Sequence, residues 1–274
     1  MTFGARDATV SFGEVVALDG VSVDVRPGSV VALVGGDGAG KTTLLRALVR
    51  EIALDSGEVR APDKQRLGYL TASSGSWGSL TAIENLEFVG GIYGLTGSGL
   101  ATRRDELLDA AGLAAAADRP ASQLSGGMRR KLGFCLAIVH APELLVLDEP
   151  STGVDPVSRI DLWRLIAAAA ADGTAVIMST TYLDEAERAA RLLVMDAGRV
   201  LTAGSYDQVR GDFVGAVTSG DPSRPEWSWR RGRDRHEYWP DGDAPSHLHV
   251  VEPDLEDIAI ALALARSNTS DVTP

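Results

Sequence analysis

A short stretch rich in glycine offers the first chemistry in this sequence. Residues 34–43 read VGGDGAGKTT, and Gly35 is followed after four residues by Gly40, Lys41 and Thr42. Glycines at this GxxxxGK[ST] spacing let several backbone N–H groups point at a phosphate without side-chain clash. The Lys41 ammonium supplies a positive charge for the outer phosphates, and the Thr42 hydroxyl is placed to bind Mg²⁺. The spacing therefore predicts a nucleotide-phosphate site.

Two elements must position this loop. The apolar run of residues 30–34 predicts a buried strand before it, and the pattern of residues 44–48 predicts a helix after it. A helix that begins near Gly40 adds its free N–H groups and the positive end of its dipole to the loop. The alternative is a glycine-rich turn that happens to carry a lysine. The flanking strand and helix and the full spacing argue against that alternative.

Two adjacent carboxylates are the second candidate for chemistry. Asp148 and Glu149 follow the apolar run of residues 144–147, which predicts a short buried strand. At the end of that strand, Asp148 can hold Mg²⁺ through water, and Glu149 can act as general base on an attacking water. Glu149, Asp148 and Lys41 are therefore the predicted catalytic residues, and Thr42 and Asp148 are the predicted Mg²⁺ ligands.

A third stretch could bind an anion at the start of a helix. Ser125, Gly126 and Gly127 precede the helical pattern of residues 129–139. A hydroxyl, bare N–H groups and a helix dipole together suit a phosphate, although such a segment alone would be only a helix cap. Its position shortly before the Asp148–Glu149 pair makes it a specific signal.

The chain as a whole alternates strands with helices, which predicts a three-layer α/β domain with a mostly parallel sheet. Ligand phosphates would lie at the carboxyl ends of its strands. Residues 7–34 predict strands, and residues 81–140 predict a helical insert with a flexible connector at 94–99. Asp155 and Pro156 predict a helix start, with Asp155 as cap. We divide the chain into a domain of residues 1–208 and a small accessory segment of residues 209–274.

Net charge, cysteine content and the length of the apolar runs disfavour several classes of function. The 274 residues carry a formal net charge of −12, which disfavours general nucleic-acid binding. The single cysteine, Cys135, lies in an apolar setting and predicts an inert core thiol in a reducing compartment. The N-terminal residues do not predict a secretory signal, and no apolar run is long enough to span a membrane. Any membrane role is therefore expected to reside in another chain.

Taken together, these stretches resemble the nucleotide-binding subunit of an ATP-binding cassette (ABC) transporter. GGDGAGKTT resembles Walker A, LSGGM the signature motif, LLVLDEP Walker B and STGVD the D-loop with Asp155. The segments LTAIENLEFVGGIYGL and LSGGMRRKLGF are similar to the branch that serves ABC-2-type and drug-resistance exporters. Residues 253–257, PDLED, fit the accessory tail of that branch, although Ala259 stands where an aromatic residue is common.

The resemblance implies a P-loop NTPase fold with an N-terminal antiparallel β portion, a helical subdomain and an ATPase activity coupled to transport. Phe12 would stack on adenine. Two such subunits would meet head to tail, with Ser125, Gly126 and Gly127 touching the ATP of the partner. The implied partners are a like or unlike ABC subunit and separately encoded membrane permeases, docked beside residues 71–90, at the cytoplasmic face of the cell membrane. The implied ATP contacts are Phe12, Val16, Gly35, Gly36, Asp37, Gly38, Ala39, Gly40, Lys41, Thr42 and Thr43.

Three positions depart from the family pattern. Gly36-Asp37 replaces the usual Pro-Asn of Walker A, and Ala72 stands where a glutamine contacts Mg²⁺. Thr181 stands where a histidine grips the γ-phosphate, and it is expected to cap the helix from Tyr182, with Asp184 completing a capping box. Losing one transition-state contact commonly costs on the order of a hundredfold in rate, so the site is expected to hydrolyse ATP slowly.

Two other functions stay open at this point. One is a regulatory module that binds nucleotide with negligible hydrolysis, which Ala72 and Thr181 favour and Glu149 opposes. The other is an ABC protein that acts on nucleic acid or ribosomes, for which the aromatic and arginine residues of 227–239 could be cited. Their alternation more simply predicts a strand with one buried face, or a contact with another protein. The four histidines lack the spacing of a metal site: His140, His236, His247 and His249.

Overall fold

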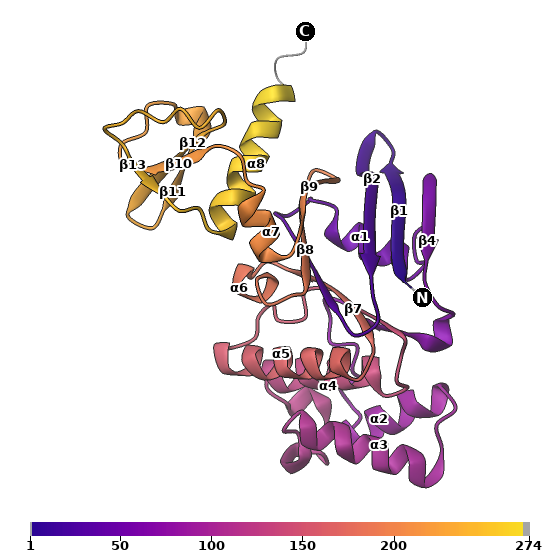
Figure 1. Cartoon of the computed structure of the whole chain (residues 1–274). Coiled ribbons are helices and arrows are strands. Elements are labelled where there is room, and N and C mark those ends of the chain that lie inside the picture. Colours follow the sequence, from indigo (N-terminus) through magenta and orange to yellow (C-terminus); the bar gives the residue numbers. More distant parts are fainter. Residues whose placement is uncertain (1, 271–274) are drawn as a thin grey trace.

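The computed structural model describes residues 2–270. Residue 1 of the predicted domain 1–208 and residues 271–274 of the predicted accessory segment lie outside the described residues. A six-stranded sheet forms the centre of the molecule, and a three-stranded sheet lies beside it (Figure 1). Helices α2 (Ala82–Ile92) and α3 (Gly97–Ala110) occupy the opposite end, and a four-stranded sheet with helix α8 (Leu255–Ser270) forms the C-terminal part.

The central sheet carries the strands that lead into the predicted site. Its order is β5-β6-β7-β3-β8-β9, and all neighbours are parallel except β8 and β9. The carboxyl ends of parallel strands share one edge of a sheet, so the segments after β3, β5, β6 and β7 all begin there. The strand bounds are β3 (Val30–Val34), β5 (Leu67–Leu70), β6 (Leu144–Leu147), β7 (Ala175–Thr180), β8 (Arg191–Asp196) and β9 (Arg199–Gly204).

Alternate residues of these strands face two separate cores, as the two-residue period of a strand requires. Val31 and Leu33 of β3 pack with Leu44 and Leu48 of helix α1 (Lys41–Leu48). Ala32 and Val34 face the other core, which contains residues of α2, α3, α4 (Gly126–Ile138) and α5 (Pro156–Ala171). The sheet buried on both faces explains why its strands read as continuous apolar runs, and the predicted α/β fold is confirmed.

The N-terminal strands form the predicted antiparallel portion. Strand β1 (Phe3–Phe12) lies between β2 (Val15–Val25) and β4 (Ser56–Arg60) in an antiparallel sheet. Helix α1 packs between this sheet and the central one, because its buried face contributes to the core that both sheets share. The tip of β1 and β2 is thereby held beside the start of α1.

The helical region differs from the prediction at one boundary. Residues 94–99 were expected to form a flexible connector, but α3 begins at Gly97 and ends at Ala110. Gly97 has a φ of +59°, which glycine adopts without steric cost. Short 3₁₀ helices follow at Ala114–Ala116 and Ala121–Gln123, and another, at Lys64–Arg66, precedes β5.

The C-terminal residues form a small sheet beside α8. After α7 (Tyr206–Gly211), the strands β10 (Ala216–Ser219), β11 (Ser228–Arg231), β12 (Asp234–Trp239) and β13 (His249–Val251) pair in the order β11-β12-β10-β13. Most of the aromatic and arginine stretch forms the β11–β12 hairpin. The guanidinium of Arg224, which precedes the hairpin, lies 3.7 Å from the Trp239 ring centroid. Trp229 of β11 packs against the buried residues of this sheet, as expected for a strand with one buried face. Trp227 packs there too, but it lies in a short 3₁₀ helix, Pro225–Trp227.

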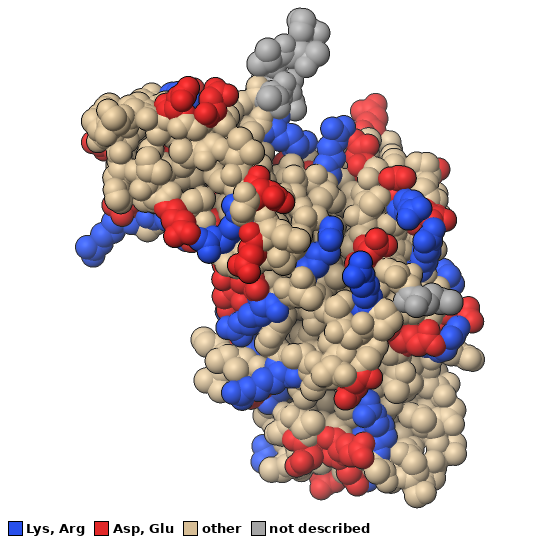
Figure 2. Space-filling model, in the orientation of Figure 1, with Lys and Arg blue, Asp and Glu red and all other residues tan. Residues whose placement is uncertain are grey.

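Charge and hydropathy give no sign of a membrane span. Within residues 2–270, every helix is too short or too polar to cross a bilayer. Basic and acidic side chains are interspersed over the visible face of the molecule (Figure 2).

Candidate nucleotide site

The loop between β3 and α1 has a backbone that only glycine suits at two positions. Gly35 has a φ of +155°, and a Cβ there would lie 2.2 Å from the Met195 carbonyl oxygen. Gly40 has a φ of +98°, and a Cβ there would lie 2.6 Å from the Ala17 carbonyl oxygen. Because L side chains rarely adopt these angles, both glycines are required by geometry as well as by the proposed ligand. The loop thus keeps its N–H groups free of side-chain cover.

Lys41 begins helix α1 and turns its side chain back over the loop. Its ammonium donates hydrogen bonds to the carbonyl oxygens of Gly35 at 2.7 Å and Gly36 at 2.9 Å. Lys41 is 5% exposed, and these two bonds hold its charge against the loop. A cation fixed in this way can neutralise phosphate oxygens that the loop N–H groups bind.

Thr42, Asp148 and Ser179 meet from three different elements. Asp148 Oδ1 accepts hydrogen bonds from Thr42 Oγ1 at 3.1 Å and from Ser179 Oγ at 2.7 Å. Oxygen donors of this kind suit Mg²⁺, which is usually held by one or two protein groups together with phosphates and waters. In residues 2–270, no cluster of three or more His, Cys, Asp or Glu side chains could hold a metal alone, so a Mg²⁺ ion here would need such additional ligands.

Glu149 has a strained backbone that its neighbours hold in place. Its φ is +46°, and a non-glycine residue in this region costs on the order of 1–3 kcal/mol. Its N–H donates to Ser179 Oγ at 2.8 Å, and its Oε2 accepts from Thr152 Oγ1 at 3.1 Å. Strain of this kind is often found at functional sites, and here it fixes the direction of a carboxylate beside the phosphate loop.

Glu149 and the phosphate loop share a hollow of about 400 Å³ with the tip of the antiparallel sheet. Phe12, Val15 and Val16 line it and are 54%, 66% and 49% exposed. Exposed apolar side chains beside polar loop groups offer a face on which a nucleobase can stack. The remaining lining residues are Ala17, Asp37, Gly38, Ala39, Gly40, Lys41, Thr42, Thr43 and Ala197.

Comparison with known proteins matches these features. Residues 18–152 fit a family model described as ABC transporter. Daunorubicin resistance ATP-binding protein DrrA3 of Streptomyces coeruleorubidus is 37% identical over 215 residues, which cover 74% of this chain and 68% of that protein. Nod factor export ATP-binding protein I of Cupriavidus metallidurans is 34% identical over 221 residues, covering 77% and 73%.

This chain belongs to the ABC transporter family. Among solved structures, the ATP-binding subunit of an ABC transporter superposes with a TM-score of 0.71 at 26% identity, covering 78% of this chain and 93% of that one. The predicted family, its drug-resistance exporter-like branch, the P-loop fold and the ATPase class are confirmed. ATP is the nucleotide of this ABC subunit.

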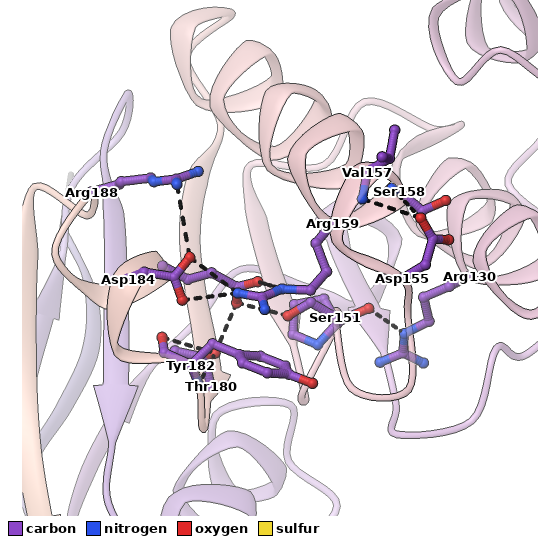
Figure 3. A network of polar contacts seen from close by, with 12 residues as sticks. Arg130, Ser151, Asp155, Val157, Ser158, Arg159, Thr180, Tyr182, Asp184 and Arg188 are labelled. Atoms are coloured by element: carbon purple, nitrogen blue, oxygen red, sulfur yellow. Dashed lines mark hydrogen bonds and ion pairs between the residues drawn. The ribbon is translucent and has the colours of Figure 1, made fainter. Parts of the chain in front are cut away.

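The signature residues lie apart from the chain's own phosphate loop. Ser125 caps α4 by accepting a hydrogen bond from the Met128 N–H at 3.2 Å. Gly127 packs against the first turn of α5, where an added Cβ would lie 2.7 Å from Ser158 Oγ. Asp155 caps that helix, as predicted, by accepting from the N–H groups of Val157 and Ser158 (Figure 3). The signature and D-loop residues therefore meet each other, while the hollow beside Lys41 is lined by neither.

Thr181 does not cap a helix as predicted. Helix α6 (Leu183–Ala186) has Tyr182 at its N-cap position without a side-chain cap, and the Tyr182 N–H donates to Thr180 Oγ1 at 3.0 Å. Asp184 accepts from Arg159 at 2.9 and 3.1 Å, so it completes no capping box. Thr181 is exposed, which leaves its hydroxyl free of this structural role.

Glu185 is a buried carboxylate that the motif spacing did not reveal. It accepts from Ser151 Oγ at 2.7 Å, Thr180 Oγ1 at 2.8 Å and Arg159 Nε at 3.1 Å. The Arg159 guanidinium also lies 3.6 Å from the Tyr182 ring centroid, between that ring and Asp184 (Figure 3). The network joins the end of β7 to the Walker B loop and to α5, and it fixes the backbone on which Thr181 stands.

Arg130 is a second residue that the motifs did not reveal. Its guanidinium reaches two loops of the site and donates to main-chain carbonyl oxygens in both. One loop is Walker B, residues 148–150, and the other is the segment 71–73, where Ala72 is exposed. Arg130 stands between Arg129 and Lys131 in the sequence. Nothing in that run of basic residues singles it out, because its partners are backbone atoms of distant loops.

The accessory segment returns to the phosphate loop through α8. Glu256, Ala259 and Ile260 of α8 line a second hollow of about 770 Å³, together with Thr181 and the start of the phosphate loop. Gly35, Gly36 and Asp37 form that start, and Asp37 lines both hollows. Arg266 Nε donates to Asp196 Oδ2 at 2.7 Å, which ties α8 to the end of β8.

The PDLED residues have a local structural role as well. Asp254 Oδ1 accepts from the N–H groups of Glu256 and Asp257 at 3.0 Å and so caps the first turn of α8. Arg231 donates to the Asp254 and Asp257 carboxylates from the β11–β12 hairpin. Leu255 is buried in the main core. The motif therefore joins α8 to both the hairpin and the central domain.

Proposed function

We propose that this ABC subunit binds ATP with Mg²⁺, hydrolyses it at a low rate, and thereby drives export through separate membrane subunits. The convergence of Thr42, Asp148 and Glu149 beside the phosphate loop is the observation that carries this proposal. The names of the relatives, daunorubicin resistance and Nod factor export, favour an exporter.

Each group of the chain then has a defined task. Lys41 and the loop N–H groups bind the outer phosphates, and Phe12 and Val16 hold the base. Thr42 and Asp148 would hold Mg²⁺, which when bound would supply positive charge against the charge that develops on the phosphates. Glu149 accepts a proton from the attacking water, and the Ser179 hydroxyl fixes its backbone.

The separation of the signature residues from the phosphate loop supports a head-to-tail pair of subunits. Ser125, Gly126 and Gly127 would then contact ATP held by the partner, and Asp155 would lie at the contact between subunits. The partner is a second copy or a different ABC subunit with a complete site. We place the pair at the cytoplasmic face of the membrane, docked beside residues 71–90, with residues 209–274 as an accessory unit of the domain 1–208. We propose no nucleic-acid partner.

Steady-state hydrolysis by the purified chain tests the proposal. Glu149→Gln should lower kcat by about 100-fold or more and leave ATP binding intact, because a general base commonly contributes this much. Glu143→Gln is the matched control, since Glu143 is exposed and pairs with Arg66. ATP binding without any hydrolysis that depends on Glu149 would instead support the second candidate, a regulatory module, which Ala72 and exposed Thr181 favour.

A further inference from the structure

A buried guanidinium lies between two loops of the site and is bonded only to main-chain oxygens. Arg130 is 5% exposed, and the hydrogen bonds of its guanidinium within residues 2–270 all go to backbone carbonyl oxygens. Its donors reach Pro150 O at 2.6 Å, Asp148 O and Glu149 O at 2.8 Å, Thr71 O at 2.8 Å, Ala72 O at 3.0 Å and Ser73 O at 2.9 Å. Burying a charge is costly unless it is fully hydrogen-bonded, and here the planar fork of arginine supplies bonds in both directions.

The contact with Walker B falls on the strained residue. Glu149 has a φ of +46°, and its two flanking peptide groups are both held: its N–H by Ser179 and its carbonyl by Arg130. Removing the Arg130 bond frees one side of this residue. The backbone of Glu149 can then relax toward a more favourable region, and its carboxylate would move with it.

The contact with residues 71–73 joins the neighbouring strand end to the same guanidinium. Strands β5 and β6 are parallel neighbours, and the Asp148 N–H donates to Leu70 O at 2.8 Å. Beyond the ends of both strands, the Arg130 side chain connects the two backbones by bonding to carbonyl oxygens of each.

We propose that Arg130 is a positioning residue for ATP hydrolysis, which holds the Glu149 carboxylate in its working direction by clamping the backbones of residues 148–150 and 71–73. This inference rests on the proposed function. Arg130 does not line the hollow beside Lys41, so it acts on the rate of hydrolysis and not on the binding of ATP.

Two measurements on Arg130→Gln, with Arg129→Gln as matched control, test this role. Arg129 is exposed, and its guanidinium donates a 3.4 Å hydrogen bond to Leu124 O. Arg130→Gln should lower kcat by roughly 10- to 100-fold with the KM for ATP changed less than about twofold, because small misplacements of a reacting group are costly. Hydrogen exchange should accelerate at the amides of residues 71–75 and 148–152 in Arg130→Gln and stay unchanged in Arg129→Gln.

Arg130→Lys keeps a charge but places all its donors on one nitrogen, which cannot span both loops. It should retain the fold and recover little of kcat, and it serves as the test variant if Arg130→Gln does not fold. Wild-type kcat and exchange in either soluble variant would overturn the proposal. A fall in kcat matched by an equal fall in the fraction of protein that binds ATP would overturn it too, because such a matched loss indicates general unfolding. Absence of hydrolysis in both wild type and Arg129→Gln would reject the proposed function instead, and the exchange data would still decide the clamp.

Discussion

Thr42 Oγ1 donates a hydrogen bond to Asp148 Oδ1 at 3.1 Å, although 106 residues separate them in sequence. The bond joins the first turn of α1 to the end of β6. It brings a hydroxyl and a carboxylate to one point beside the phosphate loop, which is the arrangement that a small, hard cation requires.

The first prediction concerns this pair. Asp148→Asn replaces a charged group, the proposed Mg²⁺ ligand, with a neutral amide, and we expect the Mg²⁺ concentration for half-maximal hydrolysis to rise by about tenfold or more. Titration of the ATPase rate with MgCl₂ at saturating ATP measures it. Asp63→Asn, at an exposed carboxylate that pairs with Arg66, is the control. An unchanged Mg²⁺ dependence would remove Asp148 from the proposed ligands.

The second prediction concerns the aromatic tip of β1. Phe12 is 54% exposed, so Phe12→Ala should hardly affect stability. Stacking of a base on an aromatic ring contributes about 1–3 kcal/mol, which predicts ATP binding roughly 5- to 150-fold weaker. Phe88→Ala removes an equally exposed ring, 49%, from α2 and should leave ATP affinity unchanged. Equilibrium titration with a fluorescent ATP analogue compares the two variants.

The third prediction concerns Thr181. Because its side chain is exposed and caps no helix, Thr181→His should fold normally and place an imidazole beside the phosphate loop. We expect kcat to rise by about tenfold or more if a missing γ-phosphate contact limits the rate. Thr181→Gln adds length without an imidazole and is the control. A rate no higher than wild type would show that this position does not limit hydrolysis.

The fourth prediction concerns pH and His140. Burial lowers the pKa of His140 below its ordinary value of 6.5. Its Nε2 contacts Leu67 O at 3.1 Å, its ring stacks on Tyr93, and its Nδ1 has no hydrogen-bond partner within residues 2–270. Protonation is therefore disfavoured in the fold, so this contribution to stability is complete above pH 6.5 and declines as pH falls toward the folded-state pKa.

Urea unfolding at pH 5 to 8 checks the sign. The free energy of unfolding of the wild type should fall between pH 7 and pH 5, and His140→Phe should lose part of that slope while keeping the stacking on Tyr93. His247→Asn, at an exposed histidine, should keep the wild-type slope. Identical slopes in all three proteins would contradict the prediction.

The sequence predicted the parts of the site that depend on local spacing. Gly35 to Thr43, the Asp148–Glu149 pair and the Asp155 cap each follow a strand or precede a helix, so a few neighbouring residues fix their geometry. The alternation of strands and helices likewise predicted a mostly parallel sheet, because each strand reads as an apolar run bounded by turns.

Other features depend on residues that meet only in the fold. Ser179 and Glu185 bond to groups about 30 residues away, and neither stands in a spacing that indicates its partner. Thr181 was misjudged because a threonine before a helix usually caps it, whereas here Thr180 takes the hydrogen bond of Tyr182. The path of α8 back to Asp37 could not be read from composition at all, since it depends on the small C-terminal sheet.

Arg130 binds its two loops through carbonyl oxygens, which every amino acid carries. The loops can therefore exchange side chains over evolutionary time without losing this contact, provided that their length and path are kept. The arginine in the signature helix can thus preserve the backbone shape of the site while the side chains of the two loops change. The segment 71–73 can therefore carry alanine at position 72 and still keep the backbone path that Arg130 holds.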